Sequence, residues 1–371
     1  MLKNFWYACE FSSAITQKPK QILMLNQRFV LYRNTHGQVV ALNDQCPHRG
    51  AALSLGWVDN NCLRCPYHGW KFQADGKCID IPANAPEMPI PKKARVDSYP
   101  VQEKYGFVWL FYGDLPPEQR PPLPTLPDSI FANLHPVEYE CTENANYARI
   151  MEINMDFAHV IAVHKQSFGQ RIPLHKTIEY QVEEDAWSGV ATVNYESLGN
   201  SKSVLNFLLG GRPQLTTRLS FFLPNVTLSE ISIGRGGAFD IKLIVLIAHL
   251  PIDEETTVVK RIFYRNFIRF PWLDGLFRKL DSKLTEEDAV IVTSLSPKSM
   301  PKLSEELHVA ADALGLAYRK LRQKYLAMGW GLESTEKPFD KANEPLATPS
   351  DILRLSRRSN LTVTGVKNET E

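Results

Sequence analysis

The chain has 371 residues, of which 44% are hydrophobic and 22% are charged. This length allows about two globular domains, each with its own core. Because 42 basic residues are balanced by 41 acidic ones, no overall field attracts nucleic acid or an anionic membrane, and we expect neither as a partner.

The chain shows neither a leader pattern nor a stretch long enough to cross a membrane. Its first residues, MLKNFWYACEF, lack a charged segment followed by a long apolar run, so we expect no signal peptide. The most apolar segment, 239–251, has about ten residues between its polar flanks, whereas a helix needs about 20 to span a bilayer. We therefore expect no transmembrane segment and a cytoplasmic location.

Residues 1–114 are expected to form an all-β domain. The segment 28–44 alternates apolar and polar residues around a central turn, which is typical of a β-hairpin. The pattern recurs around the turn at 74–76, and 104–114 contains a strand apolar enough to be buried. The next stretch, 115–127, holds six prolines, which exclude a helix or central strand and predict an interdomain linker.

Residues 128–333 are expected to form a second domain that combines strands and helices. A helix is predicted over about 144–166, followed by strand-like and then helical stretches. The strand-like stretches are 188–197, 216–233, 239–251 and 257–267, and the helical ones are 272–292 and 304–328. An antiparallel sheet packed on helices is an α+β arrangement that can enclose an apolar pocket. The polar tail at 334–371 is expected to be flexible.

Two cysteines and two histidines lie close together in the first domain, as Cys46-Pro47-His48 and Cys65-Pro66-Tyr67-His68. A [2Fe–2S] cluster can be held by two thiolates on one iron and two imidazoles on the other. Two loops that each provide one cysteine and one histidine meet this requirement. We therefore interpret Cys46 and Cys65 as ligands of one iron, and His48 and His68 as ligands of the other.

A structural zinc site is the alternative, because zinc uses the same types of ligand. Cys62 and Cys65 form a C-x-x-C pair, which is also found in zinc sites. The span offers five candidate ligands for four positions, and each histidine follows a Cys-Pro dipeptide, which favours the iron–sulfur interpretation. Cys62 is then expected to be a buried packing residue.

Asp156, His159 and His164 form a second group of candidate metal ligands. Two histidines and one carboxylate, with open positions beside them, are the facial triad of non-haem iron(II) oxygenases. A regular helix would separate histidines five residues apart by about 140°, so the helix must bend or end near one of them to direct both at one ion. The alternative is a helix with an interior aspartate and two core histidines.

The two motifs, in this order, resemble those of the Rieske non-haem iron oxygenases. CPHRG and CPYHGW resemble the Rieske motif, and Asp-x-x-His-x-x-x-x-His resembles the catalytic-iron motif of the same family. The length is similar to that of the α-only members, relatives of the aromatic ring-hydroxylating α subunits. The resemblance implies a Rieske domain at 1–114, followed by a helix-grip-like catalytic domain at 128–333.

The resemblance also implies roles for the acidic residues. In this family the aspartate at the place of Asp156 lies between the metal centres rather than on the iron. The third iron ligand is expected from a late helix, where Asp288 is the candidate and Glu286 and Glu287 compete with it. The related motif often reads Glu-Asn-x-x-Asp, whereas Ile153 stands at the asparagine position here, a departure that removes no ligand.

The implied assembly is a head-to-tail homotrimer in which Asp156 bridges His159 and His68 of the partner subunit. Electrons would pass singly from the cluster to a mononuclear Fe(II) site that uses O2. No G-x-G-x-x-G motif follows a strand, so NAD(P)H is expected to act through a separate reductase, with or without a ferredoxin.

The implied activity is an oxygenase that hydroxylates, demethylates or otherwise oxidises a small hydrophobic substrate, aromatic or polycyclic. The alternative is a Rieske-type electron carrier without oxygenase activity.

Overall fold

The computed structural model describes residues 1–165, 178, 180–195, 214–234 and 240–332, and every structural statement below concerns these residues. The tail predicted at 334–371 lies outside them, as does part of the predicted strand at 188–197. None of the helices in the described ranges is long and apolar enough to cross a membrane.

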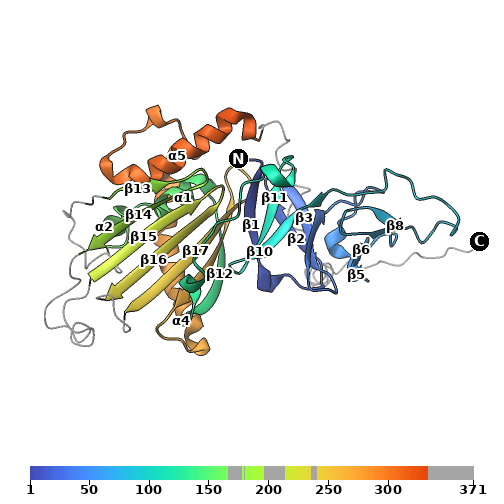
Figure 1. Ribbon diagram of the computed structural model, residues 1–371, viewed down its shortest axis with the longest axis horizontal. Coiled ribbons are helices and arrows are strands. Elements are labelled where there is room, and N and C mark those ends of the chain that lie inside the picture. The colour runs from blue at the N-terminus through green and yellow to red at the C-terminus, as the bar shows by residue number, and fades with distance from the viewer. Residues whose placement is uncertain (166–177, 179, 196–213, 235–239, 333–371) are drawn as a thin grey trace, which may run out of the picture. The chain divides into compact units, whose positions relative to one another are not determined.

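Among the described residues, the N-terminal part of the chain forms three antiparallel sheets (Figure 1). The first joins β1 (Phe5–Phe11), β11 (Phe107–Tyr112) and β10 (Val101–Lys104). The second has the order β2 (Lys20–Met24), β3 (Gln27–Arg33), β4 (Val39–Asn43) and β9 (Ser98–Tyr99). The third has the order β5 (Trp57–Asp59), β6 (Cys62–Arg64), β7 (Lys71–Phe72) and β8 (Cys78–Asp80). The two predicted hairpins are confirmed as β3–β4 and β7–β8.

The later part of the chain forms a seven-stranded antiparallel sheet and several helices (Figure 1). The strands lie in the order β12 (His135–Glu143), β18 (Thr257–Arg265), β17 (Ile241–Pro251), β16 (Val226–Gly234), β15 (Gln214–Phe222), β14 (Ser188–Tyr195) and β13 (Val182–Glu184). The helices are α1 (Tyr147–Asn154), α2 (His159–Val163), α4 (Asp274–Ser294) and α5 (Ala313–Tyr325). The predicted α+β arrangement is confirmed, although the sequence did not reveal β12 and β13.

Both faces of β17 are covered, and this explains why the strand is almost continuously apolar. Successive side chains of a strand point to opposite faces. Ile244 and Leu246 belong to the hydrophobic cluster of Trp109 in β11, so the N-terminal part of the chain covers one face. Val245 belongs to the cluster of Ile150 in α1, so helices cover the other. A strand covered on both sides loses the polar alternation that marks a solvent-facing strand.

The single helix predicted over 144–166 is wrong, because α1 ends at Asn154 and α2 begins at His159. Between them, the carboxylate of Asp156 accepts hydrogen bonds from the backbone N–H of Ala158 (2.6 Å) and of His159 (3.1 Å). An aspartate that binds the free N–H groups of a following turn starts a new helix. Asp156, which belongs to the candidate iron motif, therefore causes the break between α1 and α2.

The helix predicted over 304–328 is shorter than expected. Its regular part is α5, which begins at Ala313, and short 3₁₀ turns at Leu303–Glu305 and Ala310–Asp312 precede it. Side chains again compete for the backbone, since the Asp312 carboxylate accepts from the N–H of Val309 at 2.8 Å.

The boundaries predicted at 114 and 128 stay a prediction, because the two parts of the chain pack closely. The side chain of Asn225 bonds both the N–H (3.2 Å) and the carbonyl (3.1 Å) of Ala8 in β1. Lys260 of β18 also reaches across, with Nζ 2.8 Å from Oε1 of Glu10 in β1.

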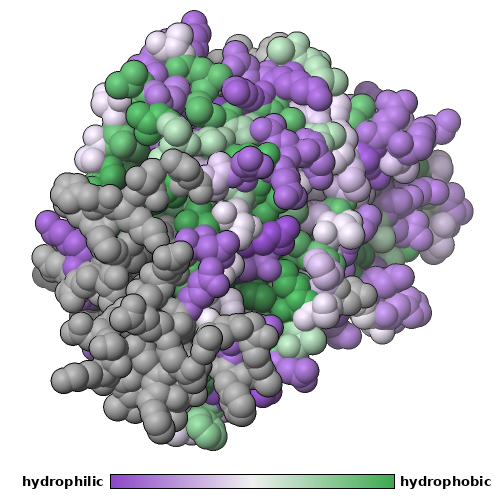
Figure 2. Space-filling view, turned by 60° about the vertical axis from the view of Figure 1, so that its left-hand side comes forward, coloured by the Kyte–Doolittle hydropathy of each residue, from purple (hydrophilic) through white to green (hydrophobic). Residues whose placement is uncertain are grey.

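On the face shown in Figure 2, hydrophilic and hydrophobic residues are interspersed, in line with the balanced charge.

The Glu10–Lys260 pair gives the first prediction. Both side chains are about 4% exposed. Burial opposes ionisation of Glu10, but Lys260 and Lys20 outweigh it and lower the pKa of this carboxyl. The pair therefore stabilises the fold above the unfolded-state pKa of about 4.3, and this stability is lost as pH falls through the lower folded-state pKa. Removing one partner of a buried pair costs about 3 kcal/mol or more.

We expect Glu10→Gln to lower the free energy of unfolding by about 3 kcal/mol at pH 7. The variant should also lose less stability than the wild type between about pH 5 and pH 3. Urea unfolding at several pH values measures both effects. Glu230→Gln is the control, because the Glu230–Arg218 pair is more exposed and removing it should cost less than about 1 kcal/mol. Equal acid sensitivity of Glu10→Gln and wild type would contradict the prediction.

Candidate functional site

The first candidate cluster is carried by two loops with matching hydrogen bonds. In one loop the N–H of Gly50 donates to the carbonyl of Cys46 at 2.9 Å, and in the other the N–H of Gly69 donates to that of Cys65 at 3.0 Å. Both glycines have positive φ, 75° and 71°, a conformation that other residues rarely adopt. The loops share this turn, and only the place of the histidine within each differs.

The cysteines of these loops face the core, and the histidines face the surface. Cys46 and Cys65 are 2% and 1% exposed. His48 and His68 are exposed, with ring centroids 4.7 Å apart. A cluster bound here would have its thiolate side buried and its imidazole side at the surface. Cys62 is buried, as expected of a packing residue.

Aromatic rings flank both histidines. Trp70 stacks on His48 with centroids 4.7 Å apart and planes 5° apart, and Tyr67 stacks on His68 at 3.8 Å. Trp70 is half-buried and packs against the core that contains the two cysteines. Such rings limit solvent access, which is one way in which a protein sets the potential of an iron–sulfur cluster.

The donor set of these loops fits two metal ions better than one. In the described part of the chain, the only three residues whose ligand atoms all lie within 4.8 Å of one another are His159, His164 and Asp288. The ligands on the two loops therefore do not converge on one point, as four ligands at about 2.0–2.3 Å from a zinc ion would. Burial, and next to it the neighbouring Cys65, raises the pKa of Cys46 to about 12, so a metal's positive charge would be needed to hold this residue as a thiolate.

The second candidate cluster is assembled by two helices. His159 is the first residue of α2, His164 directly follows its last residue, and Asp288 lies on α4. Oδ1 of Asp288 lies 3.3 Å from Nε2 of His164 and 3.7 Å from Nε2 of His159. Three donor atoms spaced in this way fit ligands that surround one metal ion at about 2.1 Å.

Each histidine is oriented through its other ring nitrogen. Nδ1 of His159 lies 2.8 Å from the backbone carbonyl oxygen of Asp156, and Nδ1 of His164 lies 2.7 Å from Oε2 of Glu287. We assign the proton to Nδ1 in both rings, since both partners are acceptors. The lone pair of each Nε2 is then directed toward Asp288, as a metal ligand requires.

Of the three acidic residues considered as the third ligand, only Asp288 faces both histidines. Glu287 contacts His164 from behind, a positioning role that the sequence analysis did not anticipate. Glu286 is exposed and accepts from the hydroxyl of Ser282 at 3.3 Å. Oδ1 of Asp288 is buried and has no hydrogen-bond partner among the described residues. A buried carboxylate oxygen in this state calls for a cation.

Asp288 belongs to a stripe of aspartates that the sequence analysis also missed. Asp274, Asp281 and Asp288 recur every seven residues on α4, which is close to two helical turns. The first two face arginines of β18: Arg265 lies 2.6 Å from Asp274, and Arg261 lies 3.6 Å from Asp281. The third faces the histidines instead. This spacing was a signal in the sequence that singles out Asp288 from its acidic neighbours.

Comparison with known families identifies two domains in the chain. Residues 5–100 match the Rieske [2Fe-2S] domain, and residues 144–328 match the vanillate O-demethylase oxygenase C-terminal domain. The chain belongs to the Rieske non-haem iron oxygenases. The resemblance noted from the two motifs is confirmed, and with it the two kinds of iron centre that define the family.

Curated relatives include oxygenases with different substrates. The chain is 34% identical over 200 residues to the 3-chlorobenzoate-3,4-dioxygenase oxygenase subunit of Comamonas testosteroni, a match that covers 50% of this chain and 45% of that protein. It is 28% identical over 330 residues to the methylxanthine N1-demethylase NdmA of Pseudomonas putida, covering 86% and 88%. The chain spans about half the length of several curated relatives. For example, its match to chlorophyllide a oxygenase from Chlamydomonas reinhardtii covers 48% of that protein.

Solved structures of the family share the fold. Dicamba monooxygenase bound to 3,6-dichlorosalicylic acid superposes with a TM-score of 0.73 at 24% identity, covering 89% of this chain and 99% of that one. NdmA, in a variant bound to caffeine, gives a TM-score of 0.69 at 22% identity, covering 90% and 98%. The predicted order of a Rieske domain followed by a sheet packed on helices is confirmed.

In this Rieske oxygenase chain, a cavity of about 400 Å³ opens beside the three candidate iron ligands. Leu219, Ile231, Val245 and Phe263, from four neighbouring strands, form much of its apolar wall. All four side chains lie on the sheet face that is covered by helices, as their cross-strand register requires. An apolar pocket was expected in this domain, but its lining residues could not be identified from the sequence.

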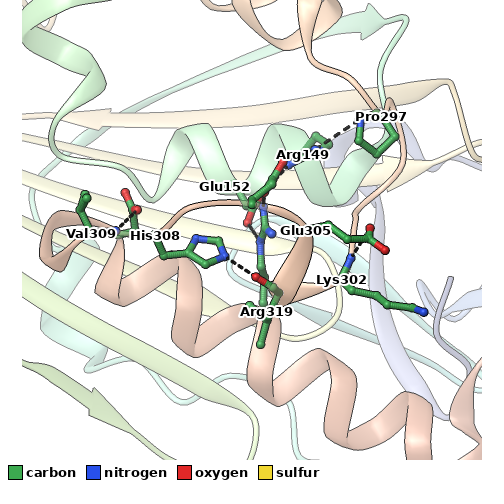
Figure 3. A network of polar contacts seen from close by, with 11 residues as sticks. Arg149, Glu152, Pro297, Lys302, Glu305, His308, Val309 and Arg319 are labelled. Carbon is green, nitrogen blue, oxygen red and sulfur yellow. Dashed lines mark hydrogen bonds and ion pairs between the residues drawn. The ribbon is translucent and has the colours of Figure 1, made fainter.

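A second cavity, of about 450 Å³, reaches the same helix break, and Asp156 and His159 line both cavities. Figure 3 shows the ion-pair network beside it. Arg149 and Arg319 are 4% and 7% exposed, and each contacts the carboxylates of both Glu152 and Glu306. The network fixes α1 to α5 and so holds the start of the helix break in place.

Glu287 gives the second prediction. As the acceptor for Nδ1–H of His164, it fixes the ring and makes Nε2 a better ligand. We expect Glu287→Gln to weaken iron binding at the second cluster by about 10- to 100-fold. Titration of apo protein with Fe(II) under anaerobic conditions measures this affinity. Glu286→Gln removes an exposed charge next to it and should leave the affinity unchanged, and equal losses in both variants would show a general charge effect instead.

Proposed function

We propose that this protein is an oxygenase that uses O2 and externally supplied electrons to oxidise a small hydrophobic substrate. One observation carries the proposal: a converging His–His–Asp set stands beside a largely apolar cavity, in a chain whose N-terminal part matches a Rieske domain. An electron carrier needs only the Rieske domain. An oxygenase also needs a substrate cavity beside a His–His–Asp iron site.

At the catalytic centre, His159, His164 and Asp288 would hold a mononuclear Fe(II). This ion supplies the open coordination positions at which O2 is activated. The chain's own contribution is to hold the ligands and exclude water. Glu287 and the carbonyl of Asp156 fix the two imidazole rings, and the apolar wall keeps a substrate dry beside them.

At the Rieske centre, Cys46, Cys65, His48 and His68 would hold the [2Fe–2S] cluster. Their arrangement places the histidine side at the surface, where electrons can enter and leave. The sequence has no dinucleotide-binding fingerprint, which supports a separate NAD(P)H-dependent reductase, with or without a ferredoxin.

We also propose the head-to-tail homotrimer, with the Rieske tip of one subunit at the second cavity of the next. Two features support it. The tip exposes His48, His68 and Tyr67, the last to 58%. The second cavity presents Asp156, whose carboxylate is only partly buried, next to the candidate ligand His159. Asp156 would then link the partner subunit's His68 to His159.

Substrate class is proposed from the cavity and the relatives together. The relatives named above are a chlorobenzoate dioxygenase subunit and a methylxanthine demethylase, and dicamba monooxygenase shares the fold. An apolar cavity of about 400 Å³ suits an aromatic or other compact hydrophobic molecule. Hydroxylation and demethylation are both compatible with this site.

The test is the metal and sulfide content of anaerobically purified protein, read with its reduced-state EPR spectrum. About three irons and two acid-labile sulfides per chain, with a Rieske-type signal, are expected. Substrate-dependent O2 consumption with a surrogate reductase is the second readout. About two irons that do not rise on Fe(II) reconstitution would support the electron carrier instead, and zinc without sulfide would exclude both functions.

A further inference from the structure

The end of the apolar cavity away from the histidines is charged. Arg261 of β18 and Asp281 of α4 both line the cavity, and their side chains are 7% and 12% exposed. Asp281 lies seven residues before Asp288 on the same helix, which places it about 10 Å from that ligand along the helix axis. A molecule that filled the cavity would have the iron at one end and this pair at the other.

The charges at this end do not balance. Arg261 is shared by two carboxylates, since Nη2 lies 3.4 Å from Oε1 of Glu143 and Nη1 lies 3.6 Å from Oδ2 of Asp281. It is also the only lysine or arginine among the described residues that line the cavity. The nearest other cations of β18 are used elsewhere, as Lys260 binds Glu10 and Arg265 binds Asp274.

Asp281 is the less satisfied of the two carboxylates. Its distance of 3.6 Å from Arg261 is too long for a hydrogen bond, and Oδ2 has no hydrogen-bond partner within the described ranges. Burial raises the pKa of Asp281, in keeping with a carboxyl group short of donors. Because the Asp281 side chain also lines the cavity, a donor on a bound ligand could supply the hydrogen bond that this carboxyl group lacks.

We propose that the substrate carries a hydrogen-bond donor, an amine or a hydroxyl group, that binds Asp281 at the far end of the cavity. This rests on the proposed function and names the substrate class of that site. The donor end is held by Asp281, and the opposite, apolar end of the substrate is the part placed beside the iron ligands. Hydrophobic carboxylates and sulfonates are disfavoured, because they would add a third anion around one guanidinium.

If Arg261 and Asp281 only stabilised the fold, a different binding result would be expected. A counterion that only neutralises Arg261 would affect stability but would not distinguish ligands of the same shape. Discrimination between a donor, an anion and a neutral molecule is therefore the property that separates a recognition site from a structural pair.

The experiment compares three probes of one shape on anaerobically purified holoprotein: 2-naphthylmethylamine, 2-naphthoate and 2-methylnaphthalene. Binding is measured by isothermal titration, without turnover. We expect the amine to bind at least about tenfold more tightly than the carboxylate, as a charged hydrogen bond in a buried site implies. Asp281→Asn should remove at least about tenfold of the amine affinity and leave the neutral probe unchanged.

Asp274→Asn is the matched control, because Asp274 also pairs with an arginine of β18 but does not line the cavity. It should leave all three affinities unchanged. Tighter binding of 2-naphthoate, binding of none of the three probes, or equal losses for all of them in Asp281→Asn would overturn the proposal. The comparison of probes on the wild type needs no variant, so a misfolded variant does not block the test.

Failure of the proposed function can be told apart from failure of this inference. The same samples are analysed for iron. An iron-free protein that still prefers the amine through Asp281 would refute the oxygenase but keep the recognition site. A protein with full iron and O2-dependent turnover that prefers the carboxylate would keep the oxygenase and refute the recognition site.

Discussion

Replacing Asp288 with asparagine is expected to remove the mononuclear iron and to leave the Rieske cluster intact. Oδ1 of Asp288 lies within 3.7 Å of Nε2 of both histidines and has no other hydrogen-bond partner in the described structure. An amide keeps the shape but removes the anionic ligand. Iron should therefore fall from about three to about two per chain, with sulfide unchanged at about two.

Turnover in Asp288→Asn should fall by about 1,000-fold or more, because several kcal/mol of ligand binding are lost. Iron analysis, the reduced-state EPR signal and product formation with a reductase together measure the effect. Glu286→Gln is the control, since Glu286 is two residues before Asp288 on α4 but exposed. Retention of about three irons in Asp288→Asn would mean that another residue provides the third ligand.

Asp156→Asn is expected to keep both metal centres and to lose coupled turnover. Its carboxylate accepts from the N–H groups of Ala158 and His159, and its backbone carbonyl accepts from Nδ1–H of His159. Asparagine retains the carbonyl and one side-chain acceptor, so the helix break should survive. The lost charge is the one proposed to link the two centres between subunits, and product formation should fall by about 100-fold.

Single-turnover experiments separate these effects. The rate at which the reduced Rieske signal disappears when substrate and O2 are added reports electron transfer, and iron content reports the two sites. Asp312→Asn is the matched control, because Asp312 lines the same cavity and also accepts from a backbone N–H. Normal electron transfer in Asp156→Asn, or the same loss in Asp312→Asn, would contradict a specific role of Asp156.

The candidate Rieske ligands could be proposed from the sequence because they form a local pattern. Each loop provides its cysteine and histidine within four residues, and the glycine that permits the turn is the fourth residue after the cysteine in both. The hairpins β3–β4 and β7–β8 were readable for the same reason, since strand alternation and turn residues are adjacent in the chain. His159 and His164 could be proposed for the same reason, because they lie five residues apart in one short segment.

Features that depend on distant contacts were missed or misjudged. The helix over 144–166 has the right periodicity, but the carboxylate of Asp156 ends it by binding the next turn. The positioning role of Glu287 depends on α4 lying against α2, 123 residues apart in the chain. No local pattern distinguishes it from the exposed Glu286.

The sequence alone determined which residues have ligand chemistry and which family they belong to, because type and spacing are properties of short segments. The three-dimensional contacts were needed to show which nitrogen of each histidine ring is free, and where Arg261 and Asp281 stand in the cavity. The physical reason is that β18 and α4 pair their side chains through space. Long-range packing sets those partners, and a linear pattern carries no record of them.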